Sequence, residues 1–192
     1  MRIVSGRYKG LGLAYPKNRD FRPTQEKVRA AILNSLGARV QGAWFLDLCC
    51  GTGAMGIEAL SRGAAGVVLV DTDVTFAKQN VAKVLAFDPE LDVSCIQVIR
   101  GDVLRVLTRL DRPFGAVFSD PPWPIATPFY DHLFGPSLLG VLANDILAPE
   151  GVLVCEHPKS LSFSPPDSVF ESSKTTRYGD TMVSMFHRKP SR

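Results

Sequence analysis

The feature that most constrains the fold of this chain is an apolar run that leads into a glycine-rich turn. Residues 44–48 (Trp-Phe-Leu-Asp-Leu) are typical of a buried strand in a parallel sheet. Three glycines in the spacing G-x-G-x-x-G follow this run: Gly51, Gly53 and Gly56. Residues 54–62 then place apolar side chains on one face of a predicted helix. Strand, glycine turn and helix in this order predict an α/β sheet that binds a nucleotide-like cofactor.

Strand-like and helix-like patterns alternate along the rest of the chain. Short apolar runs predict strands at 66–71, 93–99, 114–119 and 152–156. Between them, the sequence predicts helices at about 74–87 and 103–110 and further helical segments up to residue 148. The tail predicts two more strands, at 169–174 and 181–186, joined by a turn. This alternation favours a single α/β domain built on a mainly parallel sheet.

Acidic residues stand at the ends of four predicted strands. The carboxyl ends of parallel strands meet at one rim of a sheet, so we expect these side chains to lie together there. Four crowded carboxylates would repel one another unless each of them met a donor. We therefore expect this rim to bind a ligand rich in donors. The four residues are Asp47, Asp71, Asp102 and Asp120.

Two of these aspartates have positions suited to a nucleoside. Asp71 lies twenty residues after the first glycine of the turn, where an acidic side chain accepts hydrogen bonds from ribose hydroxyls. Asp102 would accept a hydrogen bond from the adenine amino group, with the Val103 amide facing the ring. For any one aspartate the structural alternative is a helix N-cap, and this alternative is strong for Asp102.

The glycine pattern alone does not choose between a dinucleotide and S-adenosylmethionine. Asp47 precedes the glycines by four residues, and its charge would repel a pyrophosphate. The same carboxylate, with the backbone of Gly51 and Gly53, would help to place the aminoacyl end of S-adenosylmethionine. We therefore favour S-adenosylmethionine as the cofactor, with Gly56 completing the turn.

The segment Asp120-Pro-Pro-Trp123 is the more specific signal for chemistry. An exocyclic amine of a nucleobase is a poor nucleophile, because its lone pair is delocalised into the ring. Asp120 and the carbonyl of Pro121 would accept its two hydrogens, while Pro121 and Pro122 stiffen the turn. Trp123 would stack on a base that is flipped or unpaired. The alternative is an ordinary proline turn with a packed tryptophan.

Positive charge is concentrated at the N-terminus. The whole chain carries a net charge of +3, yet its first 30 residues contain eight Lys or Arg, Arg29 among them, against two acidic residues. A basic arm predicts a nucleic-acid partner, and a merely solubilising surface is the alternative. The candidate contacts are Arg2, Arg7, Lys9, Lys17, Arg19, Arg22 and Thr24.

The N-terminal segment also has a structural interpretation. Loosely alternating apolar residues and glycines over 2–15 predict a small β-hairpin or meander. Thr24 is a predicted N-cap of a helix that ends near Gly37, so Arg22 and Thr24 would serve either RNA contact or the start of this helix. We expect residues 1–38 to form an extension and residues 39–192 to form the cofactor-binding domain.

Composition excludes several other classes of protein. No apolar run approaches the ~18 residues of a membrane span, and the N-terminus lacks the apolar core of a signal peptide, so we expect a cytoplasmic protein. The four cysteines form no C-x-x-C pair, which argues against zinc, and we expect no metal. We interpret the cysteines as small core residues and the three histidines as structural.

Taken together, these motifs resemble the RsmD-type methyltransferases, which modify the 2-amino group of one guanine in bacterial 16S ribosomal RNA. The resemblance runs nearly end to end, and its opening decapeptide and R-P-T helix start are its specific signals. Two departures are Trp123, where the family usually has Tyr, and Cys49-Cys50, where it usually has Phe-Ala. The matching stretches are Met1–Gly10, Arg22-Pro-Thr24, Val28-Arg29, 47–56, 56–63, Asp120-Pro-Pro122 and Gly179-Asp-Thr181.

The resemblance implies a Rossmann-like class I methyltransferase fold, with a mainly parallel seven-stranded sheet and an antiparallel C-terminal hairpin. It also implies S-adenosylmethionine as cofactor and a guanine of the small ribosomal subunit, or of its assembly intermediates, as substrate. The basic extension would contact this RNA, and we expect a monomer. Other interpretations stay open: the same chemistry on adenine in DNA or on a protein glutamine, an NAD-linked oxidoreductase, or an RNA chaperone without catalysis.

Overall fold

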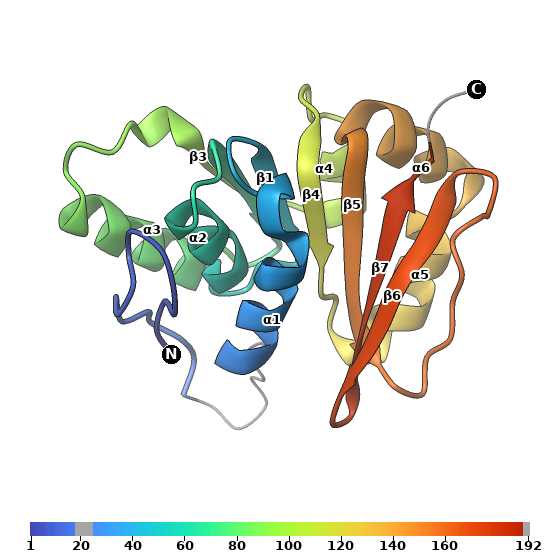
Figure 1. Ribbon diagram of the computed structural model, residues 1–192, viewed down its shortest axis with the longest axis horizontal. Coiled ribbons are helices and arrows are strands. Elements are labelled where there is room, and N and C mark those ends of the chain that lie inside the picture. The colour runs from blue at the N-terminus through green and yellow to red at the C-terminus, as the bar shows by residue number, and fades with distance from the viewer. Residues whose placement is uncertain (18–24, 190–192) are drawn as a thin grey trace.

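A computed structural model describes residues 1–17 and 25–189 of the protein and places a seven-stranded sheet at its centre (Figure 1). The strand order is β3-β2-β1-β4-β5-β7-β6. The first five of these strands are parallel, whereas β7 runs antiparallel to both β5 and β6. The strands are β1 Trp44–Leu48, β2 Gly66–Asp71, β3 Ile96–Arg100, β4 Phe114–Ser119, β5 Leu147–Pro158, β6 Phe170–Tyr178 and β7 Thr181–Arg188.

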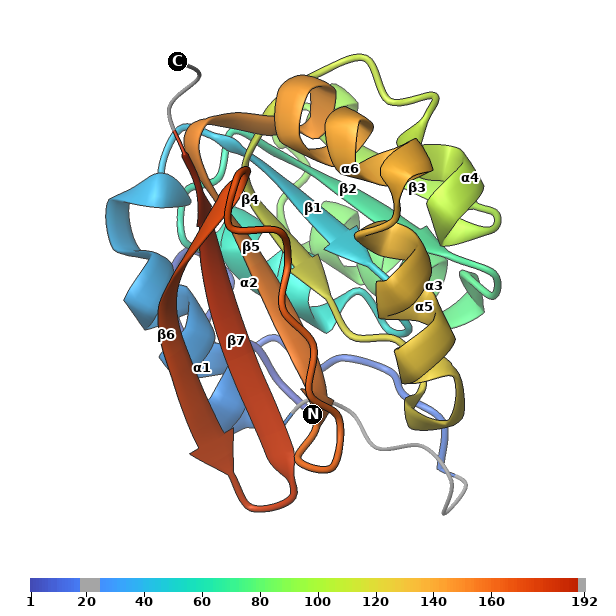
Figure 2. The same ribbon diagram turned by 90° about the vertical axis from the view of Figure 1, so that its right-hand side faces the viewer.

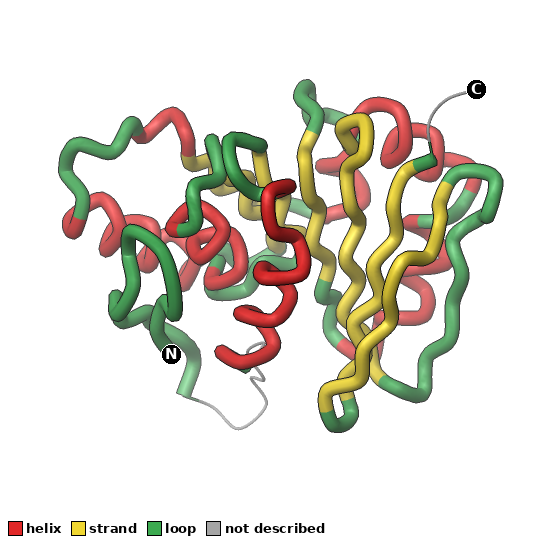
Figure 3. Tube along the Cα trace, in the orientation of Figure 1, coloured by secondary structure: helices red, strands yellow, loops and turns green. Residues whose placement is uncertain are grey.

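Helices cover both faces of this sheet (Figures 2 and 3). Because successive strand residues point to opposite faces, Phe45 packs in the core beneath α1, α2 and α3, while Leu46 packs in the core beneath α4, α5 and α6. The helices are α1 Glu26–Leu36, α2 Ala54–Ser61, α3 Thr75–Phe87, α4 Val103–Leu107, α5 Ala126–Leu133 and α6 Pro136–Val141. Shorter turns are η1 Gly37–Arg39, η2 Val93–Cys95, η3 Trp123–Ile125 and the π-helical η4 Leu142–Ile146.

This architecture confirms the predicted mainly parallel sheet with an antiparallel C-terminal hairpin. Two strands begin three or more residues from the predicted start, and β6 ends at Tyr178 rather than at residue 174. β3 begins at Ile96 rather than at residue 93, because the Asp92 side chain accepts the Ser94 N–H and starts a 3₁₀ turn. β5 begins at Leu147 rather than at residue 152, since its first residues pair with β4 before a register shift.

The predicted N-terminal β-hairpin is present as a short antiparallel pairing. Arg2 and Gly12 form one isolated bridge, and the N–H groups of Ile3 and Leu13 donate to the carbonyls of Leu11 and Met1. The same segment also bonds to α2, as the Arg7 N–H does to the Ser61 carbonyl at 2.7 Å. Gly6 has φ +82°, and a Cβ there would lie 1.8 Å from the Ser61 oxygen, so only glycine fits this approach. Helix α1 follows Gln25 as its N-cap, and the Thr24 N-cap prediction falls outside the described residues.

A buried ion pair fastens this segment to the domain. Arg29 of α1 and Glu58 of α2 are both fully buried, with Nε and Oε2 3.0 Å apart. Glu58 also accepts the Val4 N–H at 3.0 Å and pairs with Arg62, while Arg29 donates to the carbonyl of Arg2. The Glu58 carboxylate therefore joins the N-terminal arm, residues 1–17, to α1 and α2. The positive charge of Arg29 is neutralised inside the protein, so Arg29 does not contact a partner.

We expect Glu58→Gln to lower the free energy of unfolding by about 3–5 kcal/mol, because it leaves the Arg29 guanidinium buried without its counter-charge. The matched control is Glu26→Gln. Glu26 lies 3.7 Å from an exposed Arg2, and losing such a surface pair costs about 1 kcal/mol or less. Urea unfolding of both variants measures the difference, and equal losses would contradict the role assigned to Glu58.

Candidate active site

The loops that follow β1, β2, β3 and β4 are hydrogen-bonded to one another at one rim of the sheet. The Asp120 N–H donates to the Leu48 carbonyl at 3.3 Å, so the end of β4 is held beside the start of the glycine turn. Gly101 N–H donates to the Asp71 carbonyl at 2.9 Å, which joins the ends of β3 and β2. The parallel register of these strands thus brings the predicted motifs to one edge.

All four predicted aspartates act on one side chain at this rim. Burial raises the pKa of the Cys49 thiol well above its ordinary value. Four carboxylate charges raise it further, in decreasing order those of Asp71, Asp120, Asp47 and Asp102. A thiolate is disfavoured near other negative charges, so all four carboxylates lie close enough to Cys49 to oppose its ionisation. The sequence prediction that they share one rim is therefore supported by the electrostatics of the site.

The glycines of the turn are required by close packing. Gly53 has φ +73°, which favours glycine. A Cβ on Gly56 would lie 2.3 Å from Cδ2 of Leu69, so α2 approaches β2 more closely than a side chain would allow. The Gly51 N–H donates to Oδ2 of Asp71 at 2.8 Å, which holds the first glycine against the end of β2.

Asp47 lies deeper than its predicted role suggested. Its side chain is 1% exposed, and Oδ2 accepts the Gly56 N–H at 2.9 Å, so the carboxyl group supports the turn from below. Burial raises the pKa of Asp47 to about 7, against the lowering effect of the Gly56 N–H. The buried bond to Gly56 was missed by sequence reasoning, although the nine-residue separation placed both groups next to the same turn. Its contact with an aminoacyl group stays a prediction.

Asp71 and Asp102 are accessible at the rim. Asp71 is half-buried, and its Oδ1 accepts the Asp73 N–H at 3.1 Å. Asp102 is exposed and accepts the Arg105 N–H at 3.0 Å, which confirms the N-cap alternative for this residue. Each carboxylate keeps lone pairs for a further donor. Val103 is buried as the first residue of α4, and the nucleoside contacts of these residues stay predictions.

The segment after β4 presents a rigid, partly open turn. Pro121 is buried, Pro122 is exposed, and Trp123 is half-buried at the start of η3. A residue that sequence reasoning missed supports this turn: the hydroxyl of the fully buried Tyr130 lies 3.1 Å from the Ser119 carbonyl and 2.8 Å from the Glu156 carbonyl. Tyr130 thereby joins the ends of β4 and β5 immediately before Asp120.

Asn80 of α3 is a second residue that the sequence did not single out. It is fully buried and donates to the carbonyls of Ala14 and Thr52, each at 2.9 Å, while its Oδ1 accepts the Ala14 N–H at 2.6 Å. Thr52 belongs to the glycine turn and Ala14 to the N-terminal arm. A buried asparagine inside a predicted helix was the available signal, because such an amide needs partners.

The structure describes four of the seven predicted nucleic-acid contacts. Arg2 and Arg7 have side chains that are 70% and 60% exposed, and they pair with Glu26 and with Asp88, respectively. Lys9 and Lys17 are exposed. The other three predicted contacts lie outside the described residues: Arg19, Arg22 and Thr24.

Other candidate groups have structural surroundings. Nε2 of His157 lies 3.0 Å from the Ser184 hydroxyl, and all four cysteines are free thiols. Within residues 1–17 and 25–189, no three His, Cys, Asp or Glu side chains are grouped to hold a metal ion. Across the same residues, none of the helices combines the length and the apolar character of a membrane span.

Comparison with known proteins agrees with this geometry. The model of the family described as "Conserved hypothetical protein 95", the family of RsmD-type methyltransferases, matches residues 1–187. The chain belongs to this family. The predicted membership in the RsmD family is therefore confirmed, and with it methyltransferase chemistry.

Relatives of known sequence carry related names. The chain is 31% identical to "Putative rRNA methyltransferase YlbH" of Bacillus subtilis over 198 residues, which cover 98% of this chain and 100% of that protein. It is 32% identical to "Ribosomal RNA small subunit methyltransferase D" of Escherichia coli over 123 residues, 64% of this chain and 60% of that protein. These names agree with the predicted chemistry.

Solved structures confirm the class of fold. "Putative methyltransferase yhhF" from Escherichia coli superposes with a TM-score of 0.78 at 26% identity, covering 100% of this chain and 99% of that one. "SMU.776, a putative methyltransferase complexed with SAH" superposes with a TM-score of 0.66 at 14% identity, covering 88% of this chain and 50% of that one. The fold is thus that of a Rossmann-like methyltransferase, the class whose methyl donor is S-adenosylmethionine.

The raised pKa of Asp47 predicts a pH-dependent stability. Its carboxyl group keeps its proton to about pH 7 in the folded protein but loses it near pH 4 when unfolded. The folded state therefore binds more protons in this window, and stability falls as the pH rises through it. Relative to Asp47→Asn, we expect the wild-type protein to lose up to about 4 kcal/mol of unfolding free energy between pH 4 and pH 8.

Urea unfolding at several pH values measures this difference. The exposed Asp131→Asn in α5 is the control, and its difference from the wild type should not change over the same range. A pH-independent difference for Asp47→Asn would show that Asp47 titrates normally in the folded protein.

Proposed function

We propose that this protein transfers a methyl group from S-adenosylmethionine to the exocyclic 2-amino group of a guanine in 16S ribosomal RNA. One observation carries the proposal: the backbone of Asp120 is bonded to Leu48, so the Asp-Pro-Pro-Trp turn stands beside the glycine turn. Family membership and the names of the relatives support the reaction class and the ribosomal RNA substrate.

The residues at the rim fit the cofactor. We assign Gly51 and Gly53, with Asp47, to the aminoacyl end. We assign Asp71 to the ribose hydroxyls, because its carboxylate retains free lone pairs beside the Gly51 N–H. Asp102 and Val103 would hold the adenine ring. When bound, S-adenosylmethionine supplies an electrophilic methyl group.

The chain's own task is to aim a weak nucleophile. The Asp120 carboxylate and the Pro121 carbonyl accept the two hydrogens of the exocyclic amine, which turns its lone pair out of the ring plane. Proline at both following positions fixes the backbone dihedrals, so these acceptors keep their relative angle. As the nitrogen forms its new bond, one N–H proton leaves, and Asp120 is the group placed to hold it.

The target base reaches this turn only when it is unpaired or flipped out of its helix. Trp123 is half-buried at the start of η3, and we assign it to stacking on such a base, an interaction worth ~1–3 kcal/mol. We assign the arm within residues 1–38 to RNA contact. Asn80 links this arm to the glycine turn, so RNA held by Lys9 and Lys17 would lie beside the cofactor site.

Two substitutions separate the roles at the site. Asp120→Ala should lower kcat by at least about a hundredfold while the affinity for S-adenosylmethionine stays nearly intact, because it removes an acceptor used only in the reaction. Asp71→Ala should instead weaken cofactor binding about 10- to 100-fold, as expected for the loss of a hydrogen bond to a charged group. Calorimetry and single-turnover methyl transfer measure the two effects. The control is Asp131→Ala, which should change neither, and full turnover by Asp120→Ala would overturn the assignment.

A parallel assay identifies the substrate. Labelled S-adenosylmethionine is offered with small ribosomal subunits, with DNA and with protein, and the modified group is mapped by mass. We expect label in the RNA, on the 2-amino group of one guanine. Label on adenine in DNA or on a protein glutamine would support the other amine substrates that an Asp-Pro-Pro-Trp turn allows.

Tyr130 is a positioning residue for this reaction. Tyr130→Phe keeps the packed ring but removes the hydroxyl that joins the ends of β4 and β5. We expect kcat to fall about tenfold while the KM for S-adenosylmethionine is unchanged, because a small shift of Asp120 impairs alignment alone. Steady-state kinetics of both proteins test this, and a rise in KM with normal kcat would contradict it.

A further inference from the structure

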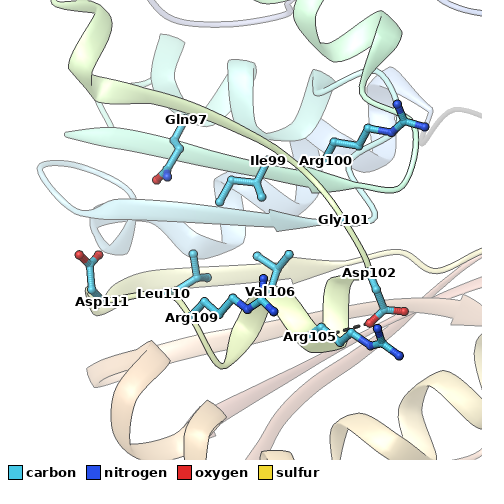
Figure 4. A pocket seen from close by; sticks show the side chains of 10 residues that line it. All are labelled: Gln97, Ile99, Arg100, Gly101, Asp102, Arg105, Val106, Arg109, Leu110 and Asp111. Atoms are coloured by element: carbon cyan, nitrogen blue, oxygen red, sulfur yellow. Dashed lines mark hydrogen bonds between the residues drawn. The ribbon is translucent and has the colours of Figure 1, made fainter.

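A cavity of about 390 Å³ lies between β3 and α4, next to the proposed active site but largely outside it (Figure 4). Its apolar lining comes from Ile99, Val106 and Leu110. Asp102 is the one residue that it shares with the proposed cofactor contacts, and neither the glycine turn nor Asp71 lines it. Figure 4 shows Asp102 at one end of the cavity and Asp111 at the other.

The charged side chains of this lining sum to a net positive charge, because the arginines outnumber Asp102 and Asp111. Three arginines contribute to it, Arg100, Arg105 and Arg109, and all three are exposed. Among the residues that the structure describes, none of the three forms an ion pair, whereas Asp111 lies 3.7 Å from Arg112, outside the cavity. Arg100 Nε donates to the Thr72 carbonyl at 3.1 Å, which points this side chain toward the loop after β2.

A cavity with an apolar floor and guanidinium groups at its mouth suits a nucleotide. Arginine binds phosphate oxygens through two parallel N–H groups, and Ile99 and Val106 offer contact area to a sugar or a base. Arg105 of α4 and Arg109 of the turn that follows it line the same cavity, so two neighbouring phosphates can be held together.

We propose that this cavity, which we call the β3–α4 pocket, binds the backbone of the substrate RNA at nucleotides that flank the target guanine. The proposal rests on the proposed function. Its Asp102 end opens at the rim that carries Asp120. In the sheet order, β3 is three strands away from β4, which corresponds to about 14 Å along the rim. A short run of nucleotides spans that distance.

The β3–α4 pocket would give the RNA a second point of attachment, opposite the N-terminal arm. The N-terminal arm packs with α1, α2 and α3 on one face of the sheet, whereas α4 covers the other face. RNA that crosses the rim between them would meet Lys9 and Lys17 on one side and Arg105 and Arg109 on the other. The target base would then stand over the Asp120 turn between two points of attachment.

The test is the double variant Arg105→Gln/Arg109→Gln. Fluorescence anisotropy with a labelled fragment of 16S ribosomal RNA gives the Kd at a series of salt concentrations. Loss of two phosphate contacts should lower the slope of log Kd against log salt by about 1.4 and weaken binding about tenfold near 0.1 M salt. Affinity for S-adenosylmethionine, measured by calorimetry, should be unchanged.

The matched control is Arg112→Gln. It removes the same charge three residues further on, but the Arg112 guanidinium lies 4.0 Å from the centre of the Trp44 ring rather than in the pocket. Its salt slope should equal that of the wild type. An unchanged slope in the double variant, or an equal fall in Arg112→Gln, would overturn the proposal.

A further experiment distinguishes RNA binding in this pocket from binding of a small anion. If inorganic phosphate stabilises the wild type but not the double variant against heat, while both bind RNA equally, the pocket is a small-anion site and the proposal is wrong. If the wild-type protein binds the RNA with a slope about 1.4 steeper than that of the double variant but never methylates it, the proposed function is wrong and the pocket assignment stands.

Discussion

The site depends on the close approach of α2 to the first two strands. Gly56 lets the helix lie against Leu69 of β2, and its N–H is held from below by the buried carboxyl group of Asp47. Any side chain at residue 56 would have to displace the Leu69 side chain, because its Cβ would lie 2.3 Å from Cδ2 of Leu69. Because Gly51 is bonded to Asp71 at the same time, the turn is fixed between two strand ends before any ligand is present. The binding geometry is therefore a consequence of packing in the core.

A second set of buried polar groups extends this rigidity to the N-terminal arm. Glu58 holds Arg29 and the backbone of Val4, and Asn80 holds Ala14 to Thr52. Each is fully buried, so each bond is made without competition from water. The arm and the glycine turn thus share one supporting layer, which gives a physical reason why the proposed RNA-binding segment and the proposed cofactor site lie in one small domain.

Electrostatics divides the surface around the rim between two kinds of partner. Four carboxylates gather around Cys49 at its centre, where a ligand rich in donors would bind. Exposed cations lie on both sides: Lys9 and Lys17 on the arm, and Arg105 and Arg109 beside α4. The negative charge at the centre of the rim would repel backbone phosphates but not an uncharged nucleobase. This arrangement favours an RNA whose backbone stays at the cationic flanks while one base enters the acidic centre.

The sequence by itself determined the sheet, the glycine turn and the four acidic strand ends, because these features depend on local periodicity and on residues a few positions apart. It predicted the short antiparallel pairing of the N-terminal segment but not the attachment of that segment to Glu58 and Ser61, more than fifty residues away. Local sequence also did not specify the carbonyl partners of Tyr130 and Asn80, or the β3–α4 pocket. Those were decided only by tertiary structure, because a buried hydroxyl or amide acquires its function from carbonyl groups that folding brings to it.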